Sequence, residues 1–544
     1  MIGETMKSRH PLLARTCLLG LVVICLALLL GMTAPQAAAR PSSVHLAGDD
    51  HRGIASAHCP PLPAPTGPTV TVSTEAALRE QAANAASGTT ILIAAGTYNL
   101  QDTVQVLNNN ITIRGLTANR GSVILDAGGM LTGHTHAIYI DADDVTIADL
   151  TIRNAGEHGV SVQGRDRPVL YNLHIKDTGY QLVKVNPLLD GSDDGLLACS
   201  RLEYTTTAPE DYTNGISAHN AHRWVVRDNE WYRIRTPNNV PAPTILFWSG
   251  SSDTIVERNL LVNCYQGIAF GNASHGSGDH LGGIVRNNFI YASLRHDSVI
   301  EMAHATGWLV ANNTALLLDP EPGLTWGMEA RFSDTTGTYA YNLLNMDILN
   351  RDGATATQTG NVTTASAGWF VNPADGNLRL RSTATGAIDQ AVTLPEVSDD
   401  FDGETRPIGS APDVGADEYT PVSTAYYRSQ GANDGWVLES TEKSKKGGSL
   451  NATAASFYLG DDASDRQYRA ILQFSASLPA NAVVTSVTLK IKKLGLVGTS
   501  PFKTHGPLLV DIRKPYFGSK ANLLISDFQA PAGKSAAAQF GIAP

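Results

Sequence analysis

Four blocks of one pattern decide the fold: Val225-Val226-Arg227-Asp228-Asn229, Ile255-Val256-Glu257-Arg258-Asn259, Ile284-Val285-Arg286-Asn287-Asn288 and Leu309-Val310-Ala311-Asn312-Asn313. Each block joins a short apolar strand to a terminal Asn. Counting from that last position extends the pattern to a series at steps of 23 to 30 residues: Asp149, Asn172, Ser200, Asn229, Asn259, Asn288, Asn313 and Asn342. Periods of 20 to 50 residues built from short strands and turns are typical of a solenoid.

A second column of apolar residues falls between these rungs without a miss. Its members are Ile138, Val160, Val183, Ile216, Ile245, Ile268, Ile300 and Met328. No helical period of 3.6 residues is sustained between the two columns, which argues against helical repeats. We therefore predict an all-β chain whose main part is a right-handed parallel β-helix. The Asn residues are expected to hydrogen-bond from coil to coil, a structural role.

The N-terminal forty residues have the order of a secretory signal. Lys7, Arg9 and Arg15 precede an apolar run, Leu18 to Leu30, and small residues follow at Ala37-Ala38-Ala39. That order predicts cleavage near Ala39, and we expect no membrane-spanning segment after cleavage. Residues 40–69 are rich in Pro and are expected to be a linker.

Three cysteines remain after the signal: Cys59, Cys199 and Cys264. An odd count is not a disulfide framework. Cys199 and Cys264 fall on different coils, too far apart for a disulfide, so buried free thiols are expected.

Ser73-Thr74-Glu75-Ala76-Ala77-Leu78 begins with N-cap residues and continues to Ala86 with good helix formers. The strand Thr90–Tyr98 follows, ending in Ala95-Gly96-Thr97-Tyr98. This opening resembles pectate-lyase-like β-helix proteins, in which a short helix plugs the barrel. The resemblance covers residues ~70–390 at the level of fold and repeat.

Two later segments also resemble parts of exported proteins. Asp399–Pro407 with Asp413–Tyr419 is similar to the closing segment of many bacterial β-helix proteins. Residues 425–544, with Asn433-Asp434-Gly435-Trp436 and Leu459-Gly460-Asp461, resemble the DNRLRE-type β-sandwich modules of secreted carbohydrate-active proteins. The expected strands there include Tyr468–Phe474 and Val483–Ile491, and the chain stops without an obvious final strand. The predicted organisation is a signal at 1–39, a linker at 40–69, a β-helix at 70–395, a closing segment at 396–424 and a β-sandwich, truncated at its end, at 425–544.

The strand of the second column should alternate, with the column residue and the residue two positions later inside the solenoid. The residues one and three positions later then face outward and include Lys184, Asn186, His219, Trp248, Glu301, Glu329 and Arg331. Connecting segments add Asp193, Asp194, Arg223, His275 and His280. Because neighbouring coils lie ~4.8 Å apart, Lys184, His219 and Trp248 should form one patch. A long face of this composition suits an extended polymer.

Two reactions fit this face. In β-elimination from a uronate polysaccharide, Lys184 or His219 would be the base, and Arg223 or Arg331 would pair with the sugar carboxylate. A Ca²⁺ ion held by Asp193 and Asp194, in the loop Asp190–Gly195, is an alternative means of neutralisation. In hydrolysis, Glu301 and Glu329 would flank the glycosidic bond at the ~5 Å that suits retention. Asn186, Arg223, Trp248, His275 and His280 are the expected substrate-binding residues.

A third possibility is a non-catalytic rod that binds glycans or cell walls. Elimination is the leading prediction, because Lys184, His219 and Arg331 are all expected on the outward face. The net charge of −11 argues against a broad nucleic-acid-binding face. The chain is predicted to act outside the cell as a monomer on an extracellular polysaccharide.

Overall fold

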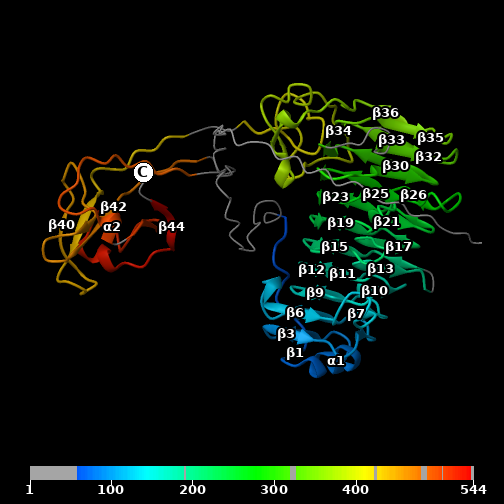
Figure 1. The fold of residues 1–544 in the computed structure, drawn as a ribbon, viewed down its shortest axis with the longest axis horizontal. Helices are drawn as coiled ribbons and strands as arrows, with labels where there is room; N and C mark the ends of the chain where they lie inside the picture. The colour runs from blue at the N-terminus through cyan, green and yellow to red at the C-terminus, as the bar shows by residue number, and fades with distance from the viewer. Residues whose placement is uncertain are drawn as a thin grey trace, which may run out of the picture.

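A computed structural model describes residues 58–188, 191–318, 326–421, 425–478, 487–504 and 506–540. The predicted signal at 1–39, Asp190, Val483–Ser486 and the last four residues lie outside the described residues. The described chain forms a long parallel β-solenoid followed by a smaller antiparallel unit (Figure 1). No helix within these ranges is both long and apolar enough to cross a bilayer.

Three parallel sheets build the solenoid, and the chain visits them in turn in each coil. The first, of 16 strands, contains β1 (Thr69–Val72), β2 (Thr90–Ile93), β5 (Thr112–Gly115), β8 (Thr146–Ala148), β11 (Val169–Tyr171), β14 (Ser192–Asp193), β15 (Leu196–Ala198), β18 (Ala221–His222), β19 (Val225–Arg227), β22 (Ser251–Ser252), β23 (Ile255–Glu257), β26 (His280–Leu281), β27 (Ile284–Arg286), β30 (Ala305–Ala311), β33 (Thr336–Ala340) and β36 (Thr357–Thr359).

The second sheet, of ten strands, contains β3 (Gly96–Asn99), β6 (Val123–Asp126), β9 (Thr151–Arg153), β12 (His174–Lys176), β16 (Arg201–Glu203), β20 (Glu230–Tyr232), β24 (Leu260–Val262), β28 (Phe289–Ala292), β31 (Thr314–Leu317) and β34 (Leu343–Leu344). The third, also of ten, contains β4 (Val104–Val106), β7 (His136–Ile140), β10 (His158–Gln163), β13 (Val183–Asn186), β17 (Ile216–His219), β21 (Pro243–Trp248), β25 (Gln266–Phe270), β29 (Ser298–Ala303), β32 (Trp326–Arg331) and β35 (Ile348–Arg351).

The predicted apolar column is confirmed in register on the third sheet. Ile138, Val160, Val183, Ile216, Ile245, Ile268, Ile300 and Met328 lie opposite one another on successive strands. All eight are fully buried in the solenoid interior. Register is fixed because a slip of one residue would turn these side chains outward.

The Asn ladder is confirmed in position from Ser200 onward. Its first two members lie one position earlier in their coils and still bond from coil to coil, the Asn172 amide donating to Asp149 at 2.8 Å. The side-chain oxygen of Asn288 accepts from the backbone N–H of Asn259 at 2.9 Å and from its amide at 3.0 Å. The same double contact runs through Asn313, Asn342 and on to Asn361. Asp149 and Asn172 instead occupy the preceding position, which has positive φ, at 59° and 49°.

The helix predicted near the start is α1 (Glu75–Asn84), and it closes the N-terminal end of the solenoid. Thr74 is the N-cap, its hydroxyl accepting from the Ala77 N–H at 3.2 Å. Leu78 and Ala82 are the buried face of the helix. A capped helix with one small apolar face therefore covers the open first coil.

Residues 365–419 pack over the outer apolar face of the second sheet at its later coils. They include β37 (Phe370–Asn372), β38 (Asn377–Leu380) and two 3₁₀ turns, η2 (Ala367–Trp369) and η3 (Pro373–Asp375). Phe401 stacks on Phe289 at 4.0 Å, and Arg406 pairs with Glu418 at 2.6 Å, both fully buried. A further 3₁₀ turn, η1 (Arg120–Ser122), lies between β5 and β6.

The C-terminal unit contains two small antiparallel sheets. One joins β39 (Gly435–Glu439), β40 (Gly447–Asn451), β41 (Gly460–Asp461) and β42 (Gln467–Ile471), and the other β43 (Leu508–Ile512) and β44 (Lys534–Phe540). The remaining elements are α2 (Pro501–Thr504) and η4 (Ile525–Gln529). This is a smaller β unit as expected, and the DNRLRE-type assignment stays a prediction.

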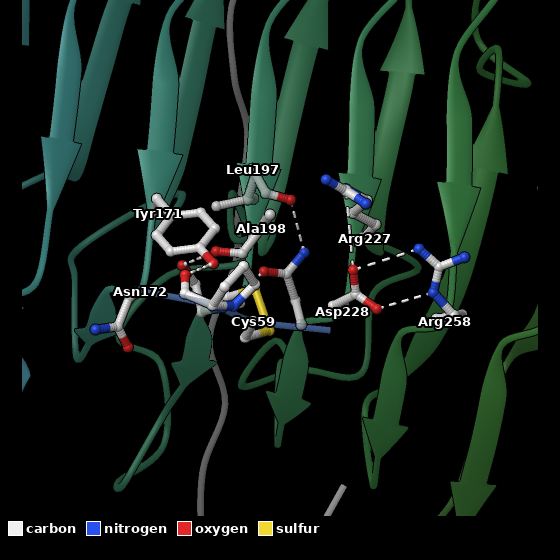
Figure 2. The surroundings of a disulfide bond; sticks show 12 residues. Cys59, Tyr171, Asn172, Leu197, Ala198, Arg227, Asp228 and Arg258 are labelled. Carbon is white, nitrogen blue, oxygen red and sulfur yellow. Dashed lines mark hydrogen bonds and ion pairs between the residues drawn. A yellow bond between two sulfur atoms is a disulfide. The ribbon is translucent and has the colours of Figure 1, made fainter. Parts of the chain in front are cut away.

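A disulfide joins Cys59 to Cys199, with their Cα atoms 5.6 Å apart (Figure 2). The prediction of a free thiol at Cys199 is therefore wrong, whereas Cys264 is free and buried as expected. Cys59 reaches Cys199 from a segment outside the repeat. The spacing of the coils relates only Cys199 and Cys264, so it gives no indication of this pair.

The segment that carries Cys59, residues 58–66, lies along the outside of the solenoid, and we call it the N-terminal strap. Tyr171 donates its hydroxyl to the Pro60 carbonyl at 2.5 Å, and Arg114 donates to the Pro63 carbonyl at 2.9 Å. The His58 ring is hydrogen-bonded to the carbonyl of Asp402 in the closing segment. The strap therefore connects early coils to the C-terminal covering.

Replacing Asn288 by Ala should lower the free energy of unfolding by about 2–4 kcal/mol. The substitution leaves buried partners on two neighbouring coils unsatisfied, each at ~1–3 kcal/mol. Equilibrium denaturation measures the change. Asn99→Ala, at an exposed position of β3, is the control and should change stability by less than about 0.5 kcal/mol. Equal losses of stability in the two variants would contradict a stabilising role for the hydrogen bonds of the Asn ladder.

A reductant should lower the melting temperature of the wild-type protein, because the disulfide closes a chain separation of 140 residues and is expected to contribute roughly 2–5 kcal/mol. Scanning calorimetry with and without dithiothreitol measures the shift. The double variant Cys59→Ser/Cys199→Ser should melt lower and be insensitive to the reductant, since buried Cys264 has no bond to lose. A reductant effect that persists in the double variant would contradict this assignment.

Candidate active site

The outer face of the third sheet carries two separate groups of polar side chains. Both follow from the alternation of inward and outward residues along each strand. The first, which we call the lysine site, centres on Lys184 of β13. The second, the carboxylate site, centres on Glu301 of β29 and Glu329 of β32.

Lys184 is only 4% exposed although it lies outside the solenoid interior. Its ammonium donates to His219 Nε2 at 2.8 Å, to the Tyr212 hydroxyl at 3.2 Å and to Ser217 Oγ at 3.5 Å. None of the carboxylates in the described ranges forms an ion pair with it. Burial lowers the pKa of Lys184 to about 8.

His219 is uncharged at neutral pH. Burial lowers its pKa to about 4, and the nearby Lys184 and His275 add to the effect. Nε2 is then free to accept from Lys184, which leaves the proton of the neutral ring on Nδ1. The Trp248 ring lies 4.4 Å from His219 and 4.3 Å from His275. The expected patch of Lys184, His219 and Trp248 is therefore formed, with His275 beside it.

A row of rings extends from the lysine site toward the N-terminal coils. Tyr212 meets Tyr180 edge-on at 5.5 Å, Tyr180 lies 6.0 Å from His158, and His158 stacks on His136 at 5.2 Å. Burial lowers the pKa of His158 to about 3, with charges on His136 and Lys184 as smaller causes. The row is therefore aromatic, and burial favours the neutral form of both histidines, so the apolar faces of sugars could pack against it.

Tyr212 and Tyr180 were missed by the sequence reasoning. Tyr212 lies in the segment between β16 and β17, and its backbone carbonyl accepts from the Gln181 side chain at 3.2 Å. The repeat identifies only positions that recur from coil to coil. A side chain on one coil's own connecting segment carries no periodic signal.

The carboxylate site places Glu301 and Glu329 directly opposite each other on neighbouring strands, as predicted. They are 8% and 1% exposed, so the expectation of an open outward column fails here. Arg351 is hydrogen-bonded to Glu329, and Arg331 pairs with Asp352 at 2.8 Å. Burial, and then the Glu329 carboxylate, raise the pKa of Glu301 to about 8.

The two sites are not one active centre. β13 and β29 are four strands apart, roughly 19 Å at ~4.8 Å a strand, and Arg331 on β32 is one strand further. Arg331 is therefore too far away to neutralise a carboxylate held at Lys184, and that part of the prediction is wrong.

His280 is also excluded from substrate binding. It is fully buried, its ring stacks on Phe270 at 4.0 Å, and its Nε2 is 3.0 Å from the Thr254 hydroxyl. Its position on β26 turns the ring into the solenoid, whereas sequence spacing alone had placed it with His275. Asn186 stays on the outer face of β13, bonded to Ser161 and Gln163 at 3.4 and 3.3 Å.

The first sheet, not the third, carries the predicted calcium ligands and Arg223. Asp193 and Asp194 lie at the end of β14, and Arg223 follows β18. Arg223 reaches Asp193 and Asp194 at 2.7 Å each, so the guanidinium occupies the position predicted for Ca²⁺. The residues present do not fit a calcium site, and Arg223 is committed to these two carboxylates.

Two other groups within the described residues bring three metal-binding side chains together. His136, Glu157 and His158 form one, and Asp400, Asp402 and Asp417 the other. The two imidazole rings are stacked at 5.2 Å with planes 9° apart, so their in-plane lone pairs lie in separate, nearly parallel planes, a poor arrangement for holding one ion. Asp400 accepts from the backbone N–H groups of residues 402, 404 and 418, and Asp402 pairs with Arg379.

Comparisons with known proteins identify the fold. The family model described as "Right handed beta helix region" matches residues 102–315. No curated protein sequence matches the chain. An alginate lyase from Paenibacillus sp. str. FPU-7 is similar over 54% of this chain and 98% of its own, with 20% identity and a TM-score of 0.40. The pectate lyase Pel9A is similar over 63% of this chain and 90% of its own, with 14% identity and a TM-score of 0.44.

A tailspike protein of E. coli bacteriophage HK620 is also similar, over 53% of this chain and 57% of its own, with 12% identity and a TM-score of 0.33. The family match and the three parallel sheets together carry the fold assignment. The main body is a right-handed parallel β-helix.

Glu301→Gln should flatten the decline of stability with rising pH. A carboxyl group whose pKa is raised by folding stabilises the protein fully below its unfolded pKa of 4.5, and this contribution is lost as pH rises toward about 8. The wild type should therefore lose more stability than the variant between pH 5 and 8.5. Urea unfolding at several pH values measures the difference.

Glu80→Gln, at an exposed position of α1, is the control and should follow the wild type. Asp297, Glu329, Arg331 and Arg351 surround Glu301 and remain in every variant, so only the difference between curves is informative. If the stability of Glu301→Gln and of the wild type changed with pH in the same way, the raised pKa of Glu301 would be contradicted.

Proposed function

We propose that this chain is an exported carbohydrate-active protein that cleaves a uronate polysaccharide by β-elimination, with Lys184 as the base. One observation carries the proposal: a buried lysine, with no acidic partner among the described residues, at the end of a row of aromatic rings on the outer face of the solenoid. Burying an amine costs stability, and a buried amine whose pKa is shifted toward neutrality is typical of a functional base.

Elimination needs a base that is unprotonated near the working pH. With the pKa of Lys184 lowered to about 8, a substantial fraction is neutral in mildly alkaline solution. Losing one proton leaves a lone pair where the ammonium had a donor, while the other contacts to His219 and Tyr212 keep the nitrogen in place. The lone pair then takes the proton next to the sugar carboxylate.

The sugar carboxylate requires hydrogen-bond donors in place of the predicted arginines. Arg223 and Arg331 are each held by aspartates. Asn186 of β13 and Trp248 of β21 lie on the same face and carry neutral donors. Their N–H groups make only long contacts with neutral partners, Asn186 with Ser161 and Gln163 and Trp248 with Ser217, at 3.3–3.4 Å. We assign Asn186 and Trp248 to substrate binding together with His275. Asp193 and Asp194 bind Arg223, so Ca²⁺ has no part in the proposed mechanism.

The alternative is glycoside hydrolysis at the carboxylate site. It is favoured by Glu301, whose raised pKa keeps it protonated at neutral pH, as a general acid requires. It is weakened by Glu329, which is 1% exposed and bonded to Arg351, and so is poorly placed to attack a sugar. The lysine site therefore remains the better candidate.

Export is supported by the predicted signal at 1–39 and by the Cys59–Cys199 disulfide, since disulfides persist mainly in oxidising compartments. The small C-terminal sheets fit an accessory role in glycan binding or anchoring.

Lys184→Met should abolish the formation of unsaturated uronates, with a loss of about 10²–10⁴-fold in kcat. The absorbance of unsaturated uronates and new reducing ends are followed on acidic and neutral polysaccharides. The wild-type rate should rise with pH and level off above about 8, because the base must lose its proton. Lys176→Met, on β12 of another sheet, is the control and should keep wild-type activity.

New reducing ends without absorbance, lost in Glu301→Gln but not in Lys184→Met, would replace elimination by hydrolysis. Binding of a polysaccharide without either product would favour the non-catalytic rod.

A further inference from the structure

The contact between Lys184 and Tyr212 has a stereochemical consequence, which rests on the proposed function. We propose that Tyr212 is the general acid that protonates the leaving oxygen, that it works from the same side of the sugar as Lys184, and that the substrate is therefore a 4-linked uronate in which the C5 hydrogen and O4 lie on one face of the ring.

Tyr212 is positioned to be both near the base and open to a ligand. Its hydroxyl is 3.2 Å from Lys184 Nζ, while the residue as a whole is 53% exposed. Its ring edge packs on Tyr180 at 5.5 Å with the planes at 70°, which limits its rotation. Burial raises the pKa of the phenol, so at neutral pH Tyr212 carries the proton that a general acid must give.

The proton and electron movements balance within these two side chains. Lys184 takes the C5 proton, the C5–H electron pair forms the C4–C5 double bond, and the C4–O4 bond breaks. O4 takes the phenolic proton of Tyr212 and leaves as a hydroxyl group. The new ammonium on Lys184 then returns a proton to the tyrosinate across their 3.2 Å contact. Both groups regain their starting forms without an outside acid or base.

The distance between the two groups decides the geometry. A base and an acid each need to be ~3 Å from the atom they serve. If they acted on opposite faces of a pyranose ring they would be separated by about 6 Å or more. Heavy atoms 3.2 Å apart can serve the neighbouring C5 and O4 only from one side.

That geometry selects a class of sugar. In the ordinary chair of 4-linked D-mannuronate and D-glucuronate, the C5 hydrogen and O4 lie on the same face. In galacturonate and guluronate, which differ from these by inversion at C4 or C5, they lie on opposite faces. The lysine site therefore suits manno- or gluco-configured uronates and disfavours the other two.

The test uses the full chain with four polymers: polymannuronate, 4-linked polyglucuronate, polyguluronate and polygalacturonate. Unsaturated product is expected from one or both of the first two only. Tyr212→Phe, which keeps the ring and loses only the hydroxyl, should lower kcat by about 10²–10⁴-fold with little change in KM. Tyr139→Phe, two strands away in the same outward column, is the matched control and should keep the wild-type rate.

Each of the other possible results would overturn one specific part of the proposal. Cleavage of polyguluronate or polygalacturonate would overturn the same-face geometry and leave elimination intact. A wild-type rate in Tyr212→Phe would overturn the role of Tyr212. Absence of unsaturated product from all four polymers would overturn the proposed function and, with it, this inference.

Discussion

Stacking of each coil on the next through main-chain hydrogen bonds is the constraint on which the structure depends. A solenoid coil cannot satisfy its own N–H and C=O groups, so every coil must present them in register to two neighbours. The buried apolar column fixes that register along the strands. The Asn ladder fixes it at the turn, where the chain leaves the strand direction and would otherwise expose buried polar groups.

This constraint also makes the outer face useful. The third sheet has ten strands, each hydrogen-bonded to its neighbours. The outward side chains are therefore displayed at a fixed spacing on a rigid surface. Lys184 remains buried beside neutral His219 and Tyr212, an arrangement that opposes its charge. A flexible loop would relax to hydrate the amine, whereas a strand in the middle of a sheet holds it in place.

Segments outside the repeat cover the first coil and the later coils of the solenoid. The helix α1 covers the first coil, and the closing segment covers an apolar face of the later coils with Phe401 and the buried Arg406–Glu418 pair. The N-terminal strap links the coil of Cys199 to the closing segment. The Cys59–Cys199 disulfide (Figure 2) makes one of these contacts, and the hydrogen bond between His58 and the Asp402 carbonyl makes the other. Unlike the coil repeat, the Phe289–Phe401, Cys59–Cys199 and His58–Asp402 contacts join residues more than a hundred positions apart.

The fold and the register could be predicted from the sequence, because both depend on positions that recur every 23 to 30 residues. Ile138 through Met328 and Asn229 through Asn342 could be aligned without a structure. The sequence also placed Lys184, His219 and Trp248 together, since a shared column and a known strand spacing imply contact. What packs over the outward-facing side chains of a sheet depends on the tertiary structure, which buries Glu301 and Glu329. The same packing turns His280 inward and pairs Arg223 with two aspartates. The tertiary structure alone brought Tyr212 to Lys184 and Cys59 to Cys199, because those partners come from single segments with no period, whose paths depend on packing.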